Sequence, residues 1–346
     1  MINPQDWSLM NVSAAFLCTV LVIGWFGILM TKTARDLAHE TGMGEVLMGA
    51  LFIGASTSLS GITTSVSAAI SGYAELAVSN SLGGIAVQTA FLAIADIAYR
   101  RANLEHAAAS AENLFMAALV MTLLSIHVVG IAVPDIGIGF IHPATLLLIA
   151  VYLLGIHLLA RTHKMPMWLP RKTQDTPMEE YQSTKRVSKG LYSLWGRFLV
   201  YSIIVAGAGW LLSQLAVPLV ERTGLSYGVV GGILTAVSTS IPELVVAVAA
   251  VRMGALNLAV GDIIGGNAFD TLFIAASDIA FHEGPIYAAV SSTELFWLAN
   301  SLLMTGVLLM GLIYRQRHGP GNIGLESTVL LLLYFGGIAL LGMGFV

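Results

Sequence analysis

The stretch GALFIGASTSLSGITTSV, residues 49–66, recurs 182 residues later as GGILTAVSTSIPELVVAV, residues 231–248. The repeat continues to position 99 in the first copy and position 281 in the second, and about 19 of 51 positions are identical without a gap. Such agreement indicates an internal duplication. Paired hydrophobic segments that Gly or Pro interrupts at corresponding positions often mark the binding site of a membrane transporter.

The composition is that of an integral membrane protein. Of the 346 residues, 56% are hydrophobic and only 10% are charged, with a mean hydropathy of +0.82, whereas soluble domains are about 25% charged. Ten apolar segments approach the roughly 20 residues that cross a bilayer: Ser13–Thr31, Val46–Ile70, Leu82–Tyr99, Asn113–Val133, Pro143–Ala160, Phe198–Pro218, Leu225–Val251, Leu258–Ala280, Ser291–Tyr314 and Leu325–Val346. The sequence therefore predicts an all-α, polytopic membrane protein of ten transmembrane helices.

The distribution of basic residues predicts the orientation, because Lys and Arg are enriched in short cytoplasmic loops. With both termini external, every Lys and Arg except Arg222 falls on the cytoplasmic side. The first segment is expected to be retained rather than cleaved, since its leader carries Asp6 and no basic residue. We expect a plasma or inner membrane location.

Five spans in each half make the second half enter the membrane in the opposite direction from the first. The predicted organisation is therefore two inverted five-helix halves, which places the two Ser-Thr-Ser strings face to face near the midplane. Helix packing through small residues is the simpler explanation for a single glycine, but it does not require the same polar string in both halves. The predicted divisions are a first half at 1–160 with its repeat at 49–99, a cytoplasmic linker at 161–197, and a second half at 198–346 with its repeat at 231–281.

The acidic residues that can bind a cation lie in the second copy of the repeat. Pro242 has no N–H group and displaces the carbonyl of Ser238 from its usual helical partner, so the helix is expected to open there. Glu243 follows directly, and Asp270 lies in the next span. A carboxylate at this depth costs several kcal/mol unless it meets a cation, a partner or a proton. Thr57 and Thr239 lie four residues before positions 61 and 243 and can offer oxygens to the same ion, or they can hydrogen-bond back to their own helices.

Asp96 and Asp278 are also paired by the repeat, but they lie near the ends of spans. Because Arg100 and Arg101 follow Asp96, an interfacial or gating pair is the preferred interpretation for this acid.

STSIPEL (residues 238–244) and GGNAFD (residues 265–270) resemble the motifs of the cation/calcium exchanger superfamily, whose members carry two inverted alpha-repeats. The first copy, with STSLSGI and GGIAVQ, is a degenerate match. The resemblance implies seven cation ligands: the side chains of Glu243, Asp270, Thr239, Thr57 and Gln88, and the carbonyls of Ala236 and Gly54. The second glutamate of the family is missing at Gly61, and the serines of the turn are missing at Gly84 and Gly266.

The function expected from this resemblance is secondary-active antiport of Ca²⁺ or a related cation against Na⁺ or H⁺. Fewer ions per cycle are expected than in relatives with both glutamates, because Ca²⁺ is held best by several carboxylates. Exchange of monovalent cations, including Na⁺/H⁺ exchange, and a degenerate protein that does not transport remain alternatives, and an ion channel is a further one. An enzyme is not expected, since the spans contain no HExxH motif and no lysine. The expected partners are small inorganic cations and the lipid bilayer, with no nucleic acid and no cofactor; the oligomeric state stays open.

Overall fold

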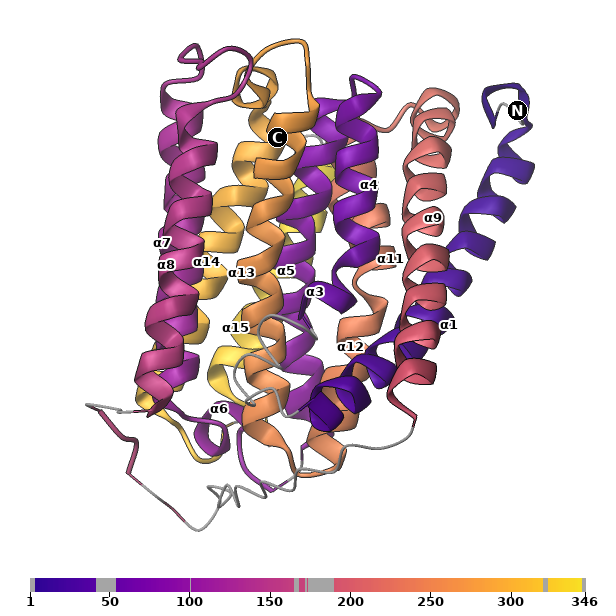
Figure 1. Cartoon of the computed structure of the whole chain (residues 1–346). Coiled ribbons are helices and arrows are strands. Elements are labelled where there is room, and N and C mark those ends of the chain that lie inside the picture. Colours follow the sequence, from indigo (N-terminus) through magenta and orange to yellow (C-terminus); the bar gives the residue numbers. More distant parts are fainter. Residues whose placement is uncertain are drawn as a thin grey trace.

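The computed structural model describes residues 4–41, 54–99, 101–164, 168–171, 173, 190–319 and 323–343. Within these residues the regular elements are helices (Figure 1). In chain order they are η1 Pro4–Asp6, α1 Leu9–Thr41, α3 Gly54–Thr57, α4 Leu59–Ile70, α5 Ala74–Ala98, α6 Leu104–Ala107, α7 Ala111–Ala132, α8 Pro143–Lys164, α9 Leu191–Thr223, α10 Tyr227–Val229, the π-helical turn η3 Val230–Thr235, α11 Ala236–Thr239, α12 Ile241–Arg252, α13 Leu256–Ala280, η4 Ile286–Ala289, α14 Ser292–Tyr314 and α15 Leu325–Gly342.

Eight of the described helices are long and apolar enough to cross a membrane. A ninth crossing is formed if Tyr227–Thr239 and Ile241–Arg252, which meet at an angle of 44°, count as one broken span. The predicted span Val46–Ile70 lies partly outside the described residues, so the count of ten stays a prediction. The helix α5 begins eight residues earlier than the predicted span Leu82–Tyr99, because its polar first turns are buried against other helices rather than exposed to lipid.

The correspondence at the offset of 182 extends to described helices outside the repeated segments. Helices α1 and α9 are both 33 residues long and begin 182 positions apart, and α5 and α13, of 25 residues each, begin at the same offset. The short helices α4 and α12 also correspond at this offset. In Figure 1, α1 begins at the upper end of the molecule and the neighbouring α9 begins at the lower end, so these two counterparts run in opposite directions.

The centre of the bundle is formed by α5 and α13, whose most apolar windows are 83% and 78% buried, whereas those of α1 and α15 are only 33% buried. Glycine allows η3 to approach both α5 and α14 closely. A Cβ added to Gly83 of α5 would lie 2.1 Å from the carbonyl oxygen of Gly232, and one added to Gly232 would clash with the buried ring of Trp297. Small residues of this kind are typical of helix contacts in membranes.

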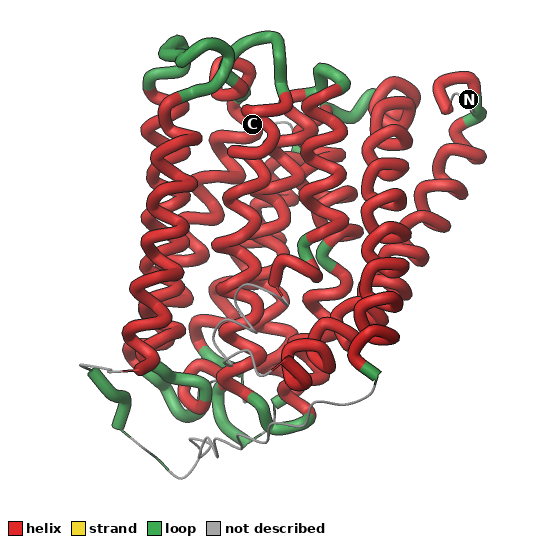
Figure 2. The backbone as a smooth tube through the Cα atoms, viewed as in Figure 1, coloured by secondary structure: helices red, strands yellow, loops and turns green. Residues whose placement is uncertain are grey.

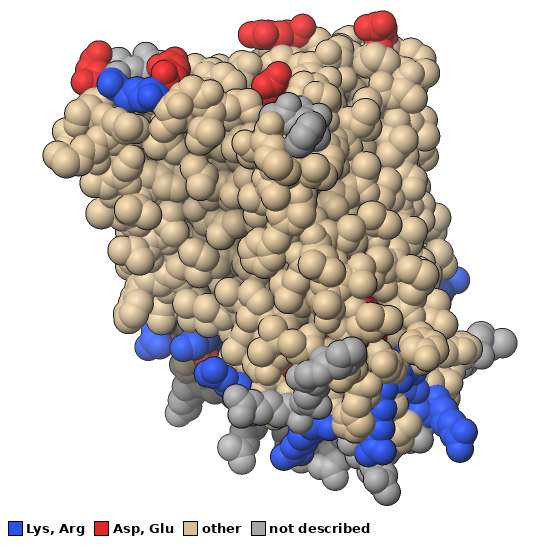
Figure 3. Space-filling model, turned by 180° about the vertical axis from the view of Figure 1, so that it is seen from behind, with Lys and Arg blue, Asp and Glu red and all other residues tan. Residues whose placement is uncertain are grey.

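On the face shown in Figure 3, exposed charged residues gather at the two ends of the molecule and leave an uncharged band between them. We call the lower end in Figures 1 and 3, where most Lys and Arg residues lie, the basic end, and the opposite end the acidic end. Exposed basic side chains at or just beyond the ends of α5, α8, α12 and α14 include Arg101, Arg161, Arg252 and Arg317. This pattern is what a chain crossing a bilayer requires.

Candidate functional site

Two helices are interrupted in the middle of the bundle, at Ser58 between α3 and α4 and at Ser240 between α11 and α12. Figure 2 shows these interruptions as loop segments at mid-height. The backbone angles agree closely, with φ −78° and ψ 2° at Ser58 and φ −95° and ψ 3° at Ser240. Pro242 follows the second break, as the sequence predicted, but Ser60 occupies the same place after the first. Proline is therefore not required for the break itself.

The two halves meet through Ser58, whose hydroxyl lies 2.7 Å from Asp270 Oδ1 and 3.4 Å from Glu243 Oε1. On the other side of Asp270, the amide nitrogen of Gln88 donates to Oδ2 at 2.6 Å and lies 3.3 Å from the hydroxyl of Ser240. All five side chains are buried. The structure thus brings Glu243, Asp270 and Gln88 together, and it adds two serines that the sequence did not assign as ligands.

Two oxygens at this centre, Glu243 Oε2 and Gln88 Oε1, have no hydrogen-bond partner among the described residues. A buried oxygen without a donor is unfavourable. A cation supplies the missing positive charge, and carboxylate and amide oxygens are ligands that hard cations prefer. The unpartnered oxygens are therefore the feature that favours cation binding here.

The other four predicted ligands form two equivalent pairs. The hydroxyl of Thr57 donates to the Gly54 carbonyl at 2.9 Å, and that of Thr239 lies 3.2 Å from the Ala236 carbonyl. The Thr57 hydroxyl also lies close enough to Glu243 to interact with it. The hydroxyl protons face the helix backbone, which is the alternative the sequence left open, but each hydroxyl oxygen keeps acceptor capacity for an ion.

The structure explains the family residues that are missing from the two repeats. A Cβ on Gly61 would lie 2.6 Å from the Phe273 ring, so this ring occupies the place of a second glutamate. A Cβ on Gly84 would lie 3.3 Å from Asp270 Oδ2, and one on Gly266 would lie 3.1 Å from Gln88 Oε1. The two glycines let the carboxyl and amide groups lie directly against the helices.

Asp262 is a candidate that the sequence interpretation missed. It is buried on α13, both of its carboxyl oxygens lack hydrogen-bond partners within the described part of the chain, and it interacts electrostatically with Glu243. Its repeat counterpart is Asn80, whose amide nitrogen donates to the Gly61 carbonyl and to Ser65 Oγ. The first repeat has an asparagine at position 80 where the second has an acid at position 262. This difference is the signal that would have identified Asp262.

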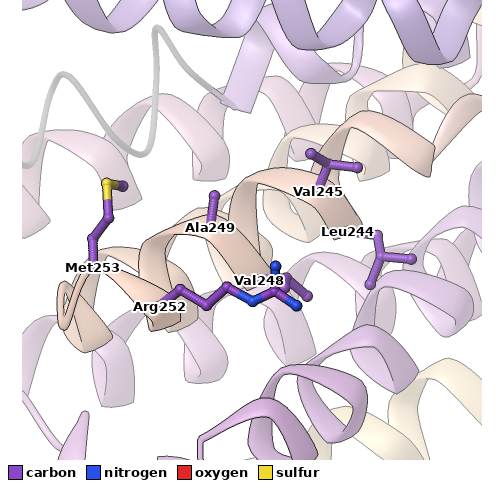
Figure 4. A pocket seen from close by; sticks show the side chains of 6 residues that line it. All are labelled: Leu244, Val245, Val248, Ala249, Arg252 and Met253. Atoms are coloured by element: carbon purple, nitrogen blue, oxygen red, sulfur yellow. The ribbon is translucent and has the colours of Figure 1, made fainter.

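A separate pocket lies along α12 (Figure 4) and is lined by Leu244, Val245, Val248, Ala249, Arg252 and Met253. It contains one guanidinium group and no carboxylate, so it is not suited to a cation. Among the described residues no group of three or more His, Cys, Asp or Glu side chains is arranged to hold a metal. The candidate cation site therefore depends on two close carboxyl groups with amide, hydroxyl and carbonyl oxygens.

The family model described as "Sodium/calcium exchanger protein" matches residues 12–161 and 192–343. Inner membrane protein YrbG of Escherichia coli is 24% identical over 311 residues, which cover 90% of this chain and 91% of YrbG. Two solved structures have a similar fold. The sodium-calcium exchanger NCX_Mj has a TM-score of 0.62 at 18% identity, covering 95% of this chain and 98% of its own. The H⁺/Ca²⁺ exchanger CAX has a TM-score of 0.69 at 12% identity, covering 96% of this chain and 86% of its own.

Proposed function

Because the chain belongs to the sodium/calcium exchanger protein family, we propose that it is a secondary-active antiporter that binds its transported cation at Glu243 and Asp270. The single observation that carries this assignment is the pair of unpartnered buried oxygens, Glu243 Oε2 and Gln88 Oε1, at the junction of two broken helices. The proposed substrate is Ca²⁺ or a related divalent cation, exchanged for Na⁺ or H⁺. The names of the two exchangers with a similar fold, one for Na⁺ and one for H⁺, support this choice of counter-ions.

The ligand set supports a low number of ions per cycle. Ca²⁺ takes six to eight oxygens and binds best where several carboxylates contribute. The proposed site offers the carboxylates of Glu243 and Asp270, the amide oxygen of Gln88, the hydroxyls of Thr57 and Thr239, and the carbonyls of Gly54 and Ala236. Two carboxylates neutralise one divalent cation, and Phe273 fills the place of a third.

Alternating access in this proposal uses two inverted halves that move around the midplane site. The common offset of 182 residues and the opposite directions of α1 and α9 support it. The basic end is assigned to the cytoplasm, because Lys and Arg are enriched in cytoplasmic loops, which places both termini outside. An inner or plasma membrane location is supported by the name of the E. coli relative.

Flux into proteoliposomes tests the proposal. Wild-type protein should take up Ca²⁺ when an imposed Na⁺ or H⁺ gradient drives the counter-ion out of the vesicles. Glu243→Gln should abolish this uptake, because the amide keeps the shape of the side chain but loses its charge. Glu112→Gln, at the start of α7 outside the site, is the matched control and should transport like the wild type. Transport by Glu243→Gln at the wild-type rate would contradict the site.

Exchange of monovalent cations is the second candidate, because only two carboxyl groups lie close together at the centre. It predicts Na⁺/H⁺ exchange that Ca²⁺ does not inhibit. Ca²⁺ uptake by the same vesicles would exclude it.

A further inference from the structure

A buried aspartate holds the loop at the acidic end. Asp278, at the end of α13, accepts hydrogen bonds from the backbone N–H groups of Ile286 and His142, each at 2.8 Å, and from the hydroxyl of Thr145 at 2.6 Å. Nearby, the hydroxyl of Tyr287 lies 2.9 Å from His127 Nδ1. We call this group the acidic-end cap. Both carboxylate oxygens of Asp278 therefore accept hydrogen bonds.

A corresponding arrangement, which we call the basic-end cap, lies at the basic end. Its aspartate, Asp96, is 182 residues before Asp278. Asp96 accepts from the backbone N–H groups of Leu104 at 2.7 Å and Gly324 at 2.8 Å, and Ser327 stands where the acidic-end cap has Thr145. Asp96 was expected to form an interfacial or gating pair with an arginine. Of the two arginines considered, Arg100 lies outside the described residues, and Asp96 hydrogen-bonds with two main-chain N–H groups and with the Ser327 side chain.

The basic-end cap differs from its counterpart by two additional acids. Glu105 takes the position of Tyr287, and Glu326 takes the position of Ala144. A Cβ placed on Gly324 would lie 3.4 Å from Asp96 Oδ2, from Glu105 Oε2 and from Glu326 Cδ. Three carboxyl groups from α5, α6 and α15 therefore converge on one point, and their exposed fractions are 0%, 1% and 6%.

Within the described residues, Glu105 Oε2 and Glu326 Oε1 have no hydrogen-bond partner, while Glu105 Oε1 accepts from Ser327 at 3.2 Å. Among the described residues, the basic side chains of Arg315 and His106 at this end have hydrogen-bond partners other than the three acids. Arg315 donates to the carbonyls of His106 and Arg171. His106 bonds the Arg315 carbonyl and Thr173 through its two ring nitrogens.

Carboxyl groups this close and this buried do not all ionise together, because like charges in a low-dielectric environment repel strongly. The described residues form no group suited to a metal ion here. A proton on one of the carboxyl groups removes this repulsion.

We propose that Asp96, Glu105 and Glu326 form a proton-binding site, separate from the transport site, that holds α6 and the start of α15 against α5 when protonated and loosens them when the proton leaves. The site responds to the pH of the compartment that the basic end faces. It does not depend on the identity of the transported ion.

The direction of the pH response follows from Glu105. Burial, followed by the charge of Asp96, raises the pKa of Glu105 from 4.5 to about 8. A raised carboxyl pKa means that the folded protein binds the proton more tightly than the unfolded chain does. The stabilisation is complete below pH 4.5 and is lost as the pH rises through about 8.

Thermal unfolding of the purified full-length protein tests the site. Between pH 6 and pH 9, the melting temperature of the wild type should fall by several degrees more than the melting temperature of Glu105→Gln. The side chain of the variant is neutral at every pH. Glu112→Gln, at the same end but outside the cap, should follow the wild type. A wild-type decline that Glu105→Gln reproduces in full would overturn the proposal.

Hydrogen exchange of the wild type provides a test that needs no variant. The protection of the Leu104 and Gly324 amides should fall, between pH 6 and pH 9, relative to that of the Ile286 and His142 amides in the acidic-end cap. Comparing equivalent amides removes the intrinsic pH dependence of exchange. An unchanged ratio would show that the basic-end cap binds no proton in this range. Neither measurement uses transport, so failure of the antiport proposal leaves both interpretable.

Discussion

At the scale of single residues, the carboxyl groups of α13 differ in their partners. Asp270 has a donor on each oxygen, from Ser58 and Gln88, and Asp278 has three donors. Asp262 has none among the described residues. A buried carboxyl without partners destabilises the fold, and such exceptions to local rules are expected near functional sites.

Asp262→Asn should therefore stabilise the protein by about 1–3 kcal/mol, because a neutral amide costs less to bury than an unpaired charge. The variant carries the residue that the repeat places at position 80, and it removes an unpartnered carboxyl group. Thermal unfolding at constant pH measures the effect. Asp278→Asn, which disturbs a carboxylate with three donors, serves as the opposite control and should destabilise. A lower melting temperature for Asp262→Asn would show that this carboxyl has a stabilising partner.

At the scale of elements, the break between α11 and α12 is supported by α1. A Cβ on Gly27 would lie 2.5 Å from Pro242 Cγ, so the helix α1 touches the proline ring directly. The equivalent break at Ser58 forms without proline. Pro242 therefore contributes a surface for α1 to pack against, as well as a missing N–H group.

Gly27→Val should destabilise the protein by about 1–3 kcal/mol, because overpacking of a close contact displaces one of the helices. Adding Pro242→Ala should recover part of this loss by removing the atoms that clash. Thermal unfolding of the two single variants and the double variant measures the coupling. Gly207→Ala on α9, where no described atom lies within 4 Å of the added Cβ, should be close to neutral. If the changes in unfolding free energy of Gly27→Val and Pro242→Ala simply add in the double variant, the proposed contact between these two residues would be ruled out.

At the scale of the whole molecule, the proposed cation joins the two repeats. Glu243 and Asp270 come from the second repeat, and Gln88, Thr57 and the Gly54 carbonyl come from the first. A cation bound between them stabilises the folded arrangement of both halves, since it binds only where the repeats are assembled.

The transported cation should accordingly raise the melting temperature of the wild type. At 100 times its dissociation constant the gain is about 2.7 kcal/mol. Asp270→Asn should show a much smaller shift, because it removes one of the two charges. Thermal shifts with Ca²⁺, Mg²⁺, Mn²⁺, Na⁺ and K⁺ identify the ion. Equal shifts in wild type and variant for every ion would place binding elsewhere.

The membrane class, the duplication and the pair Glu243 and Asp270 could be recognised in the linear chain. Hydropathy, repeat offset and an acid beside a helix-breaking proline are all local properties, so they are visible without a fold. The family assignment drawn from the motifs is confirmed by the family model. The seven proposed ligands stay predictions, but the structure brings the acids and Gln88 into one hydrogen-bonded group.

Other features depend on contacts between residues far apart in sequence, which no local pattern encodes. Ser58 bridges both acids across 185 and 212 positions. Phe273 fills the place of a second glutamate at Gly61, and Glu105 and Glu326 meet Asp96 only because α6 and α15 pack against α5. Local chemistry therefore identified the charges of this protein, while only the packing of its helices decided which charges have partners, because burial and hydrogen bonding are properties of the assembled bundle.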